Sequence, residues 1–154
     1  MSVMAVAKRQ AYHGSRGYES MVVLSATNPH LHYDAWELPA LTGRAQRPGR
    51  LADAARQDPP GFLCFGPNQF LPPGRYGVEF RFSANRKDAG EVTVGKWDVT
   101  LGGTIVTGGL IQAGMTAAGA VVNVATQSEV EARIYFGGKG VLCAESVDIR
   151  RMDW

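Results

Sequence analysis

An alternating run of large side chains in residues 61–83 constrains the fold of this chain more than any other sequence feature. The run reads GFLCFGPNQFLPPGRYGVEFRFS, and turn-forming residues interrupt it at positions 66–68 and 71–74. Alternation of β-forming residues between Pro and Gly is typical of β-strands. Residues 61–83 therefore predict two strands separated by turns. The side chains expected in the core are Phe62, Phe65, Tyr76, Val78, Phe80 and Phe82.

Short apolar runs separated by turn residues continue along the rest of the chain. The predicted strands are residues 21–26, 30–38, 91–101, 104–112, 120–126, 130–136 and 140–150. Many short strands spaced by roughly ten residues indicate an all-β fold, an antiparallel β-sandwich or a barrel. Residues 39–60 predict a loop with a helical turn at 51–56. Residues 1–20 show no sustained period, so we expect an extended lead-in to a single β-sandwich domain over residues 21–154.

The bulk properties of the chain argue against two classes of partner. Its 154 residues carry a formal net charge of +2, which falls short of the clustered basic charge that nucleic acids require. No apolar run approaches the roughly 20 residues of a membrane span, and the opening MSVMAVAKRQ lacks the pattern of a signal peptide. We therefore expect a cytoplasmic protein, or a domain of a longer chain, that binds neither nucleic acid nor membrane.

The two cysteines lie in apolar, strand-like runs, FLCFG around Cys64 and GVLCA around Cys143. Such cysteines are predicted to act as small buried side chains. A disulfide is the alternative, and it requires the two strands to be neighbours in an oxidising compartment.

Four runs of residues from Tyr33 onward carry a resemblance to a known family. They read DAWELPALTGR, GFLCFGPNQFLPPGRYGVEFRF, GKWDVTLGG and EVEARIYFGGKGVLCAESVDIRR. This order of strands and loops resembles the galactose-binding-like jelly rolls, β-sandwiches that include many carbohydrate-binding modules. The runs LPPGRYGVEF and VEARIYFGGKG are similar to those of modules attached to bacterial glycosyltransferases. The resemblance implies a non-catalytic domain that binds carbohydrate, with a parent enzyme as a further partner.

Sugar recognition requires an aromatic surface for the C–H face of a pyranose and planar polar groups for its hydroxyls. Trp97 is the first candidate, because it stands between Lys96 and Asp98 where the strand alternation is interrupted. One interpretation has Trp97 projecting from a loop rim with Lys96 and Asp98 beside it. The other has Trp97 packed between the two sheets.

Three further residues are candidates for the same binding site. Trp36 stands on the polar face of HLHYDAWEL, where exposure and burial are both open. Asn85 and Arg86 begin a polar turn that reaches the same rim or is simply solvated.

A structural calcium ion is a further hypothesis that the resemblance implies. Relatives in this fold hold calcium between the first and last strands through carboxylates. The matching positions here are Asp34 or Glu37 together with Glu145 or Asp148. Calcium takes six or more oxygen ligands, which backbone carbonyls would complete; the alternative is that these carboxylates face solvent.

The pattern H-x-H-x-D at residues 30–34 is a separate metal hypothesis, and it would make the protein an enzyme. Alternate residues of a strand point the same way, so His30, His32 and Asp34 would share one face. The pattern resembles the metal-binding motif of metallo-hydrolases, but that motif continues with His where this chain has Ala35. No other catalytic motif is present: G-x-S-x-G does not occur, and GGTIVTGG fits neither nucleotide-binding glycine pattern.

An assembly domain is the alternative to a carbohydrate-binding module. The apolar, Gly-rich residues 104–124 would cover or supply a sheet edge. In that interpretation the sandwich pairs with copies of itself, as a homo-oligomer, or with a parent enzyme.

Overall fold

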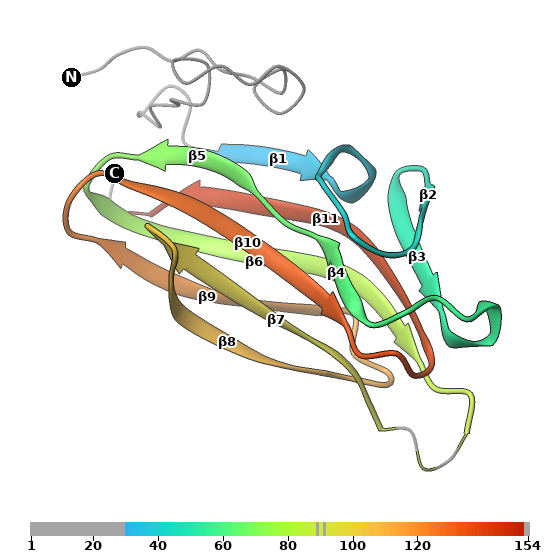
Figure 1. Ribbon diagram of the computed structural model, residues 1–154. Coiled ribbons are helices and arrows are strands. Elements are labelled where there is room, and N and C mark those ends of the chain that lie inside the picture. The colour runs from blue at the N-terminus through green and yellow to red at the C-terminus, as the bar shows by residue number, and fades with distance from the viewer. Residues whose placement is uncertain (1–29, 89, 91, 153–154) are drawn as a thin grey trace.

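The computed structural model of the protein describes residues 30–88, 90 and 92–152. These residues form two antiparallel β-sheets packed face to face (Figure 1). The predicted all-β antiparallel sandwich is thereby confirmed. The predicted lead-in at residues 1–20 and strand at 21–26 lie outside the described residues. Within the described part, no helix is long and apolar enough to cross a membrane.

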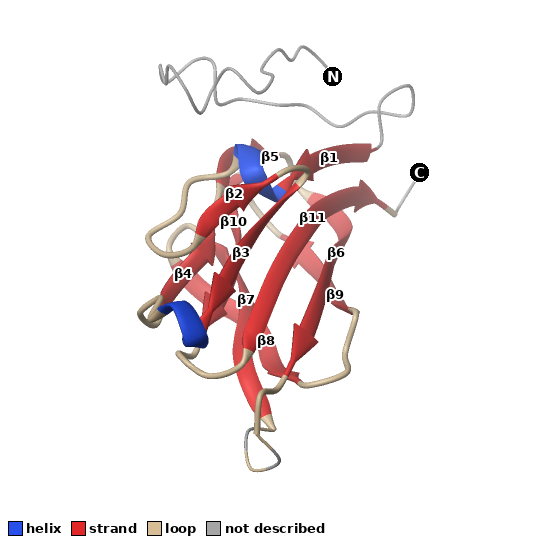
Figure 2. Cartoon of the chain, turned by 90° about the vertical axis from the view of Figure 1, so that its right-hand side faces the viewer, coloured by secondary structure: helices blue, strands red, loops and turns tan. Residues whose placement is uncertain are grey.

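The first sheet contains six strands and is seen nearly face-on in Figure 2. Its strands are β1 (His30–Asp34), β2 (Arg44–Gln46), β3 (Gly49–Asp53), β6 (Gly74–Asn85), β9 (Ala117–Val124) and β11 (Val141–Arg151). They pair in the order β2-β3-β11-β6-β9, and β1 also pairs with β11. The last strand of the chain, β11, is therefore central to this sheet and pairs with β1 and β3 from the beginning of the described chain.

The second sheet contains five strands. They are β4 (Gly61–Cys64), β5 (Pro67–Leu71), β7 (Thr93–Leu101), β8 (Thr104–Gln112) and β10 (Ser128–Phe136). They pair in the order β4-β10-β7-β8, with β5 also on β10. Gly66 makes the corner between β4 and β5 at φ 114°, a conformation that glycine adopts readily. Residues 61–83 thus supply three strands, one more than predicted, because the short segment after this corner also pairs with β10.

Two predictions before residue 61 need correction. The predicted strand at 30–38 ends at Asp34, where the 3-10 helix η2 (Ala35–Glu37) begins and the Glu37 side chain accepts a bond from the Asp34 N–H. The predicted loop at 39–60 contains the hairpin β2–β3, which the sequence pattern missed because β3 alternates weakly and is held by pairing with β11. The predicted helical turn is present as a second 3-10 helix, η3 (Ala54–Arg56).

The core lies between the sheets and is filled mainly by alternate residues of the long strands. Tyr76, Val78, Phe80 and Phe82 of β6 are at most 2% exposed, as their alternation predicted. Burial alternates in the same way along β10, SEVEARIYF. Two of the expected core residues differ, because Phe62 and Phe65 are only partly buried.

Candidate functional site

Three neighbouring strands of the five-stranded sheet place aromatic and charged side chains on one outer surface. In the register of β7 and β10, Lys96 lies opposite Tyr135 and Asp98 lies opposite Arg133. Phe62 of β4 lies opposite Tyr135 on the other side. The residues that alternate with these along β10 are buried between the sheets, so this set faces outward. We call these five residues, Phe62, Lys96, Asp98, Arg133 and Tyr135, the outer aromatic face.

The outer aromatic face contains an ion pair. Arg133 donates from Nε to Asp98 Oδ1 at 2.7 Å and from Nη2 to Asp98 Oδ2 at 2.9 Å. The two side chains are 21% and 12% exposed, respectively. The hydrogen bond with Asp98 raises the pKa of Arg133, against the opposing effect of burial. A two-point pair of this kind fixes the guanidinium and carboxylate planes relative to each other.

Two aromatic rings lie on the same face as this ion pair. The Arg133 Cζ lies 4.6 Å from the centroid of the Phe62 ring, within the range of a cation–π contact. The Phe62 and Tyr135 rings meet edge to face, with centroids 5.4 Å apart. Lys96 Nζ lies 5.1 Å from the centroid of the Tyr135 ring. Apolar rings and planar charged groups are thus held side by side by strand pairing, an arrangement that fits ligands with both apolar and hydroxyl-bearing faces.

Trp97 lies in the core instead of on this surface. It is 8% exposed, and its ring packs against Phe80 of the other sheet with centroids 5.3 Å apart. Gly109 of β8 leaves room for the indole, since a Cβ at that position would lie 3.0 Å from Trp97 Nε1. The expectation that Trp97 projects from a loop rim is therefore wrong. β7 stays extended through this region, so Trp97 points inward while its neighbours Lys96 and Asp98 share the outer face.

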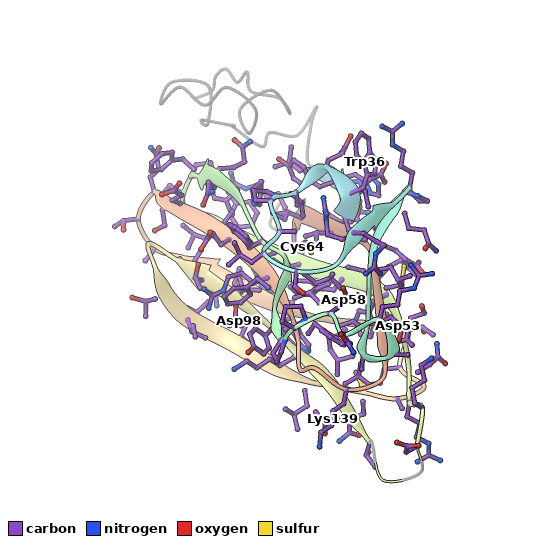
Figure 3. The ribbon with its side chains drawn as sticks, turned by 45° about the vertical axis from the view of Figure 1, so that its right-hand side comes forward. Trp36, Asp53, Asp58, Cys64, Asp98 and Lys139 are labelled. Atoms are coloured by element: carbon purple, nitrogen blue, oxygen red, sulfur yellow. The ribbon has the colours of Figure 1, made fainter. Side chains whose placement is uncertain are left out.

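The other predicted ligand-binding residues lie away from the outer aromatic face. Trp36 is partly buried in η2, where Arg47 Cζ lies 4.2 Å from its ring centroid. Figure 3 shows Trp36 and Asp98 in well-separated parts of the molecule. Asn85 ends β6, where it pairs with Val141 of the six-stranded sheet, and Arg86 follows it in an exposed turn.

The H-x-H-x-D residues do share the outer face of β1, as predicted, but the two histidine side chains bond to the carboxylates of Asp148 and Asp34. His30 Nε2 lies 2.8 Å and His32 Nδ1 lies 2.7 Å from the same Oδ1 of Asp148. His32 Nε2 lies 2.9 Å from Asp34 Oδ1. The hydrogen bond with Asp148 raises the pKa of His32, with partial burial opposing and the Asp34 bond reinforcing the shift. The cluster therefore ties β1 to β11.

The carboxylates proposed for calcium do not form a ligand set in this structure. Glu37 caps η2, Glu145 is exposed on β11, and Asp148 holds the two imidazoles. Across the described ranges, no group of three or more His, Cys, Asp or Glu side chains is placed to hold a metal ion. Calcium binding therefore stays a prediction.

A shallow groove lies on the opposite side of the molecule, over β6, β9 and β11. Its volume is about 570 Å³, and Glu79, Asp148 and Arg150 are its charged residues. Val121 and Met152 supply its larger apolar side chains. All the described residues that line it are non-aromatic, so it lacks the stacking surface that the outer aromatic face has.

Sequence reasoning found Lys96 and Asp98 but missed three members of the outer aromatic face. The sequence predicts Phe62 in the core because aromatic residues in a strand usually point inward. Arg133 and Tyr135 alternate with buried residues in β10, a signal that marks them as outward-facing. Their place beside Asp98 depends on a strand register that no local pattern reveals.

Comparisons with known proteins place the fold in the jelly-roll class. No protein-family model and no curated protein matches the sequence. The C-terminal family 6 carbohydrate-binding module (CBM6) of LamC, a laminarinase of Zobellia galactanivorans, matches the fold at a TM-score of 0.50 and 16% identity, over 79% of this chain and 99% of that one. The insecticidal delta-endotoxin Cry8Ea1 of Bacillus thuringiensis matches at a TM-score of 0.52 and 12% identity, over 87% of this chain and 25% of that one.

More distant matches include a family 36 carbohydrate-binding module (CBM36) solved with calcium and xylotriose. It has a TM-score of 0.43 and 10% identity, over 77% of this chain and 98% of that one. The match to the LamC module confirms the expected likeness to carbohydrate-binding jelly rolls at the level of the fold. The toxin match shows that the fold also occurs as part of a protein named for another activity, so the fold alone does not establish a function.

Proposed function

We propose that the protein is a non-catalytic carbohydrate-binding module that binds a glycan on its outer aromatic face. The observation that carries the proposal is the Arg133–Asp98 pair, held at 2.7 and 2.9 Å beside the rings of Phe62 and Tyr135. A pyranose has an apolar C–H surface and a rim of hydroxyls, and these five side chains offer a partner for each. Preorganised polar groups favour binding because less side-chain freedom is lost.

Each side chain has a distinct role in this proposal. Phe62 and Tyr135 supply apolar ring surface to the sugar. The Asp98 oxygens accept hydrogen bonds from hydroxyls while keeping their bonds to Arg133. A guanidinium has five N–H donors, of which Arg133 uses two on Asp98, and Lys96 adds an exposed ammonium group. The fold supports this proposal through its likeness to the laminarinase module, which also suggests a domain that serves a larger enzyme.

A glycan array with the wild type and matched variants tests the proposal. Arg133→Ala and Tyr135→Ala change the outer aromatic face. Arg81→Ala is the control, because Arg81 is an exposed arginine in a 3.4 Å ion pair with Glu79 on the other sheet. Circular dichroism establishes that every variant is folded before binding is compared.

The proposal predicts that the wild type retains at least one class of glycan. Both face variants are then expected to bind that glycan at least about tenfold more weakly, a loss equivalent to about 1.4 kcal/mol, while Arg81→Ala binds as the wild type does. Retention of no glycan by the folded wild type would overturn the proposal. Equal losses in the Arg81 variant and the face variants would also overturn it.

A further inference from the structure

Strand β8 presents a long, uncharged edge. It is the last strand in the order β4-β10-β7-β8, so within the described part of the chain one of its edges has no paired strand. Its nine residues, TIVTGGLIQ, include no proline and no charged side chain. Ile105 is 58% exposed, Leu110 is 56% exposed and Val106 is 47% exposed. Residues 99–128 contain no Lys, Arg, Asp, Glu or His, so no charge of this segment lies along the edge.

The edges on the opposite side of the sandwich differ from β8. β2 has only three residues and includes Arg44, and β4 and β5 are short and separated by a corner with Pro67. Short edge strands, charges and proline are the features by which proteins discourage strand addition. β8 has none of these three. Its pairing with β7 has two register shifts, at Thr93/Gly95 and at Val99/Thr100, and it is regular between them from Thr107 to Ile111.

The regular part of β8 is complementary to itself. Gly108 lies opposite Asp98 and Leu110 lies opposite Lys96, so both face the outer side of the sheet. In an antiparallel pair centred on Gly109, Leu110 of one copy lies across from Gly108 of the other. On each side of the twofold axis, the Leu110 side chain of one copy thus lies beside the glycine of the other copy. The two copies contribute the same residues, as an isologous interface requires.

We propose that the protein dimerises by antiparallel pairing of β8 with β8 of a second copy. The partner strand satisfies the edge backbone groups and covers the exposed Leu110. Because β8 brings no charge to the contact, neither copy desolvates a charged group there. The two five-stranded sheets become one continuous sheet. The dimer does not depend on glycan binding, and either proposal can fail without the other.

Sedimentation velocity over a range of concentrations tests the dimer with one variant and one control. Leu110→Lys places a charge on the edge. Leu41→Lys is the matched control, because Leu41 is 71% exposed and lies in the connection between η2 and β2. Hydrogen–deuterium exchange of the wild type at low and high concentration reports which strand becomes covered, without any substitution.

The proposal predicts a wild type that reaches twice the chain mass as concentration rises. Leu110→Lys is expected to raise the dimer dissociation constant at least about tenfold, because the interface loses an apolar side chain from each copy. Leu41→Lys is expected to leave the dissociation constant unchanged. Amides of β8 gain protection at high concentration. A wild type that stays monomeric at every concentration would overturn the proposal, and so would a dimer whose protection appears on another strand.

Discussion

Removing the Arg133 guanidinium is expected to lower the free energy of unfolding by about 2–3 kcal/mol. In the Arg133→Ala variant the Asp98 carboxylate, whose side chain is only 12% exposed, loses two hydrogen bonds of 2.7 and 2.9 Å. Hydrogen bonds to charged groups contribute about 1.5–3 kcal/mol. Removing one partner of a fully buried ion pair costs about 3–5 kcal/mol of stability. Because both side chains of this pair keep some exposure, we expect a loss below that range.

A double-mutant cycle with Arg133→Ala and Asp98→Ala isolates the interaction, measured by urea unfolding. We expect a coupling energy of about 1–2 kcal/mol, since part of the single-variant loss is the penalty of the unpaired charge. Arg81 and Glu79 form the control cycle: their side chains are 57% and 50% exposed and the contact is 3.4 Å. An exposed pair contributes at most about 1 kcal/mol, and we expect a value near zero. Equal coupling in the two cycles would refute the view that Asp98 and Arg133 are held together by partial burial.

Three further predictions concern the core and the titratable groups. Trp97→Ala is expected to lower the free energy of unfolding by about 3–5 kcal/mol, because the indole fills space against Phe80; a small loss in chemical denaturation would place the ring outside the core. His32 has a raised pKa through its bond to Asp148, so its stabilising effect is complete below the unfolded pKa and is lost as pH rises through the folded pKa. The melting temperature of the wild type should therefore fall more than that of His32→Gln between pH 5.5 and pH 8, and parallel pH profiles would contradict this. Burial raises the pKa of the Cys64 thiol to about 12, so a thiol reagent at pH 8 should label Cys64 only on unfolding. Rapid labelling of Cys64 itself in the native protein, distinguished from the partly buried Cys143 by peptide mapping, would contradict its burial.

The fold was predictable from the sequence because its strongest signal is local. Alternation in β6 places Tyr76, Val78, Phe80 and Phe82 on one side of a strand, and the structure buries all four. The hairpin β2–β3 was not predictable, because its short strands depend on pairing with residues about ninety positions later in β11. Whether the two cysteines form a disulfide also depends on which strands are neighbours. Both are free and they lie in different sheets, Cys64 in β4 and Cys143 in β11.

The candidate site was predictable only in part. The side chains of Lys96 and Asp98 are neighbours on one face of one strand, so their proximity follows from local geometry. Their partners Arg133 and Tyr135 come from a strand more than thirty residues later and are placed by register. Trp97 was ambiguous because an indole next to charged residues fits a loop rim or a core equally well. Only the continuity of β7 decides that it points inward.

The location of the glycan site is tested most directly by a backbone amide NMR titration with a glycan that the protein retains. The proposed function predicts shift changes concentrated on Phe62, Lys96, Asp98, Arg133 and Tyr135 of β4, β7 and β10, which saturate with glycan concentration. Changes concentrated instead along the groove of β6, β9 and β11 would contradict the assignment of the outer aromatic face.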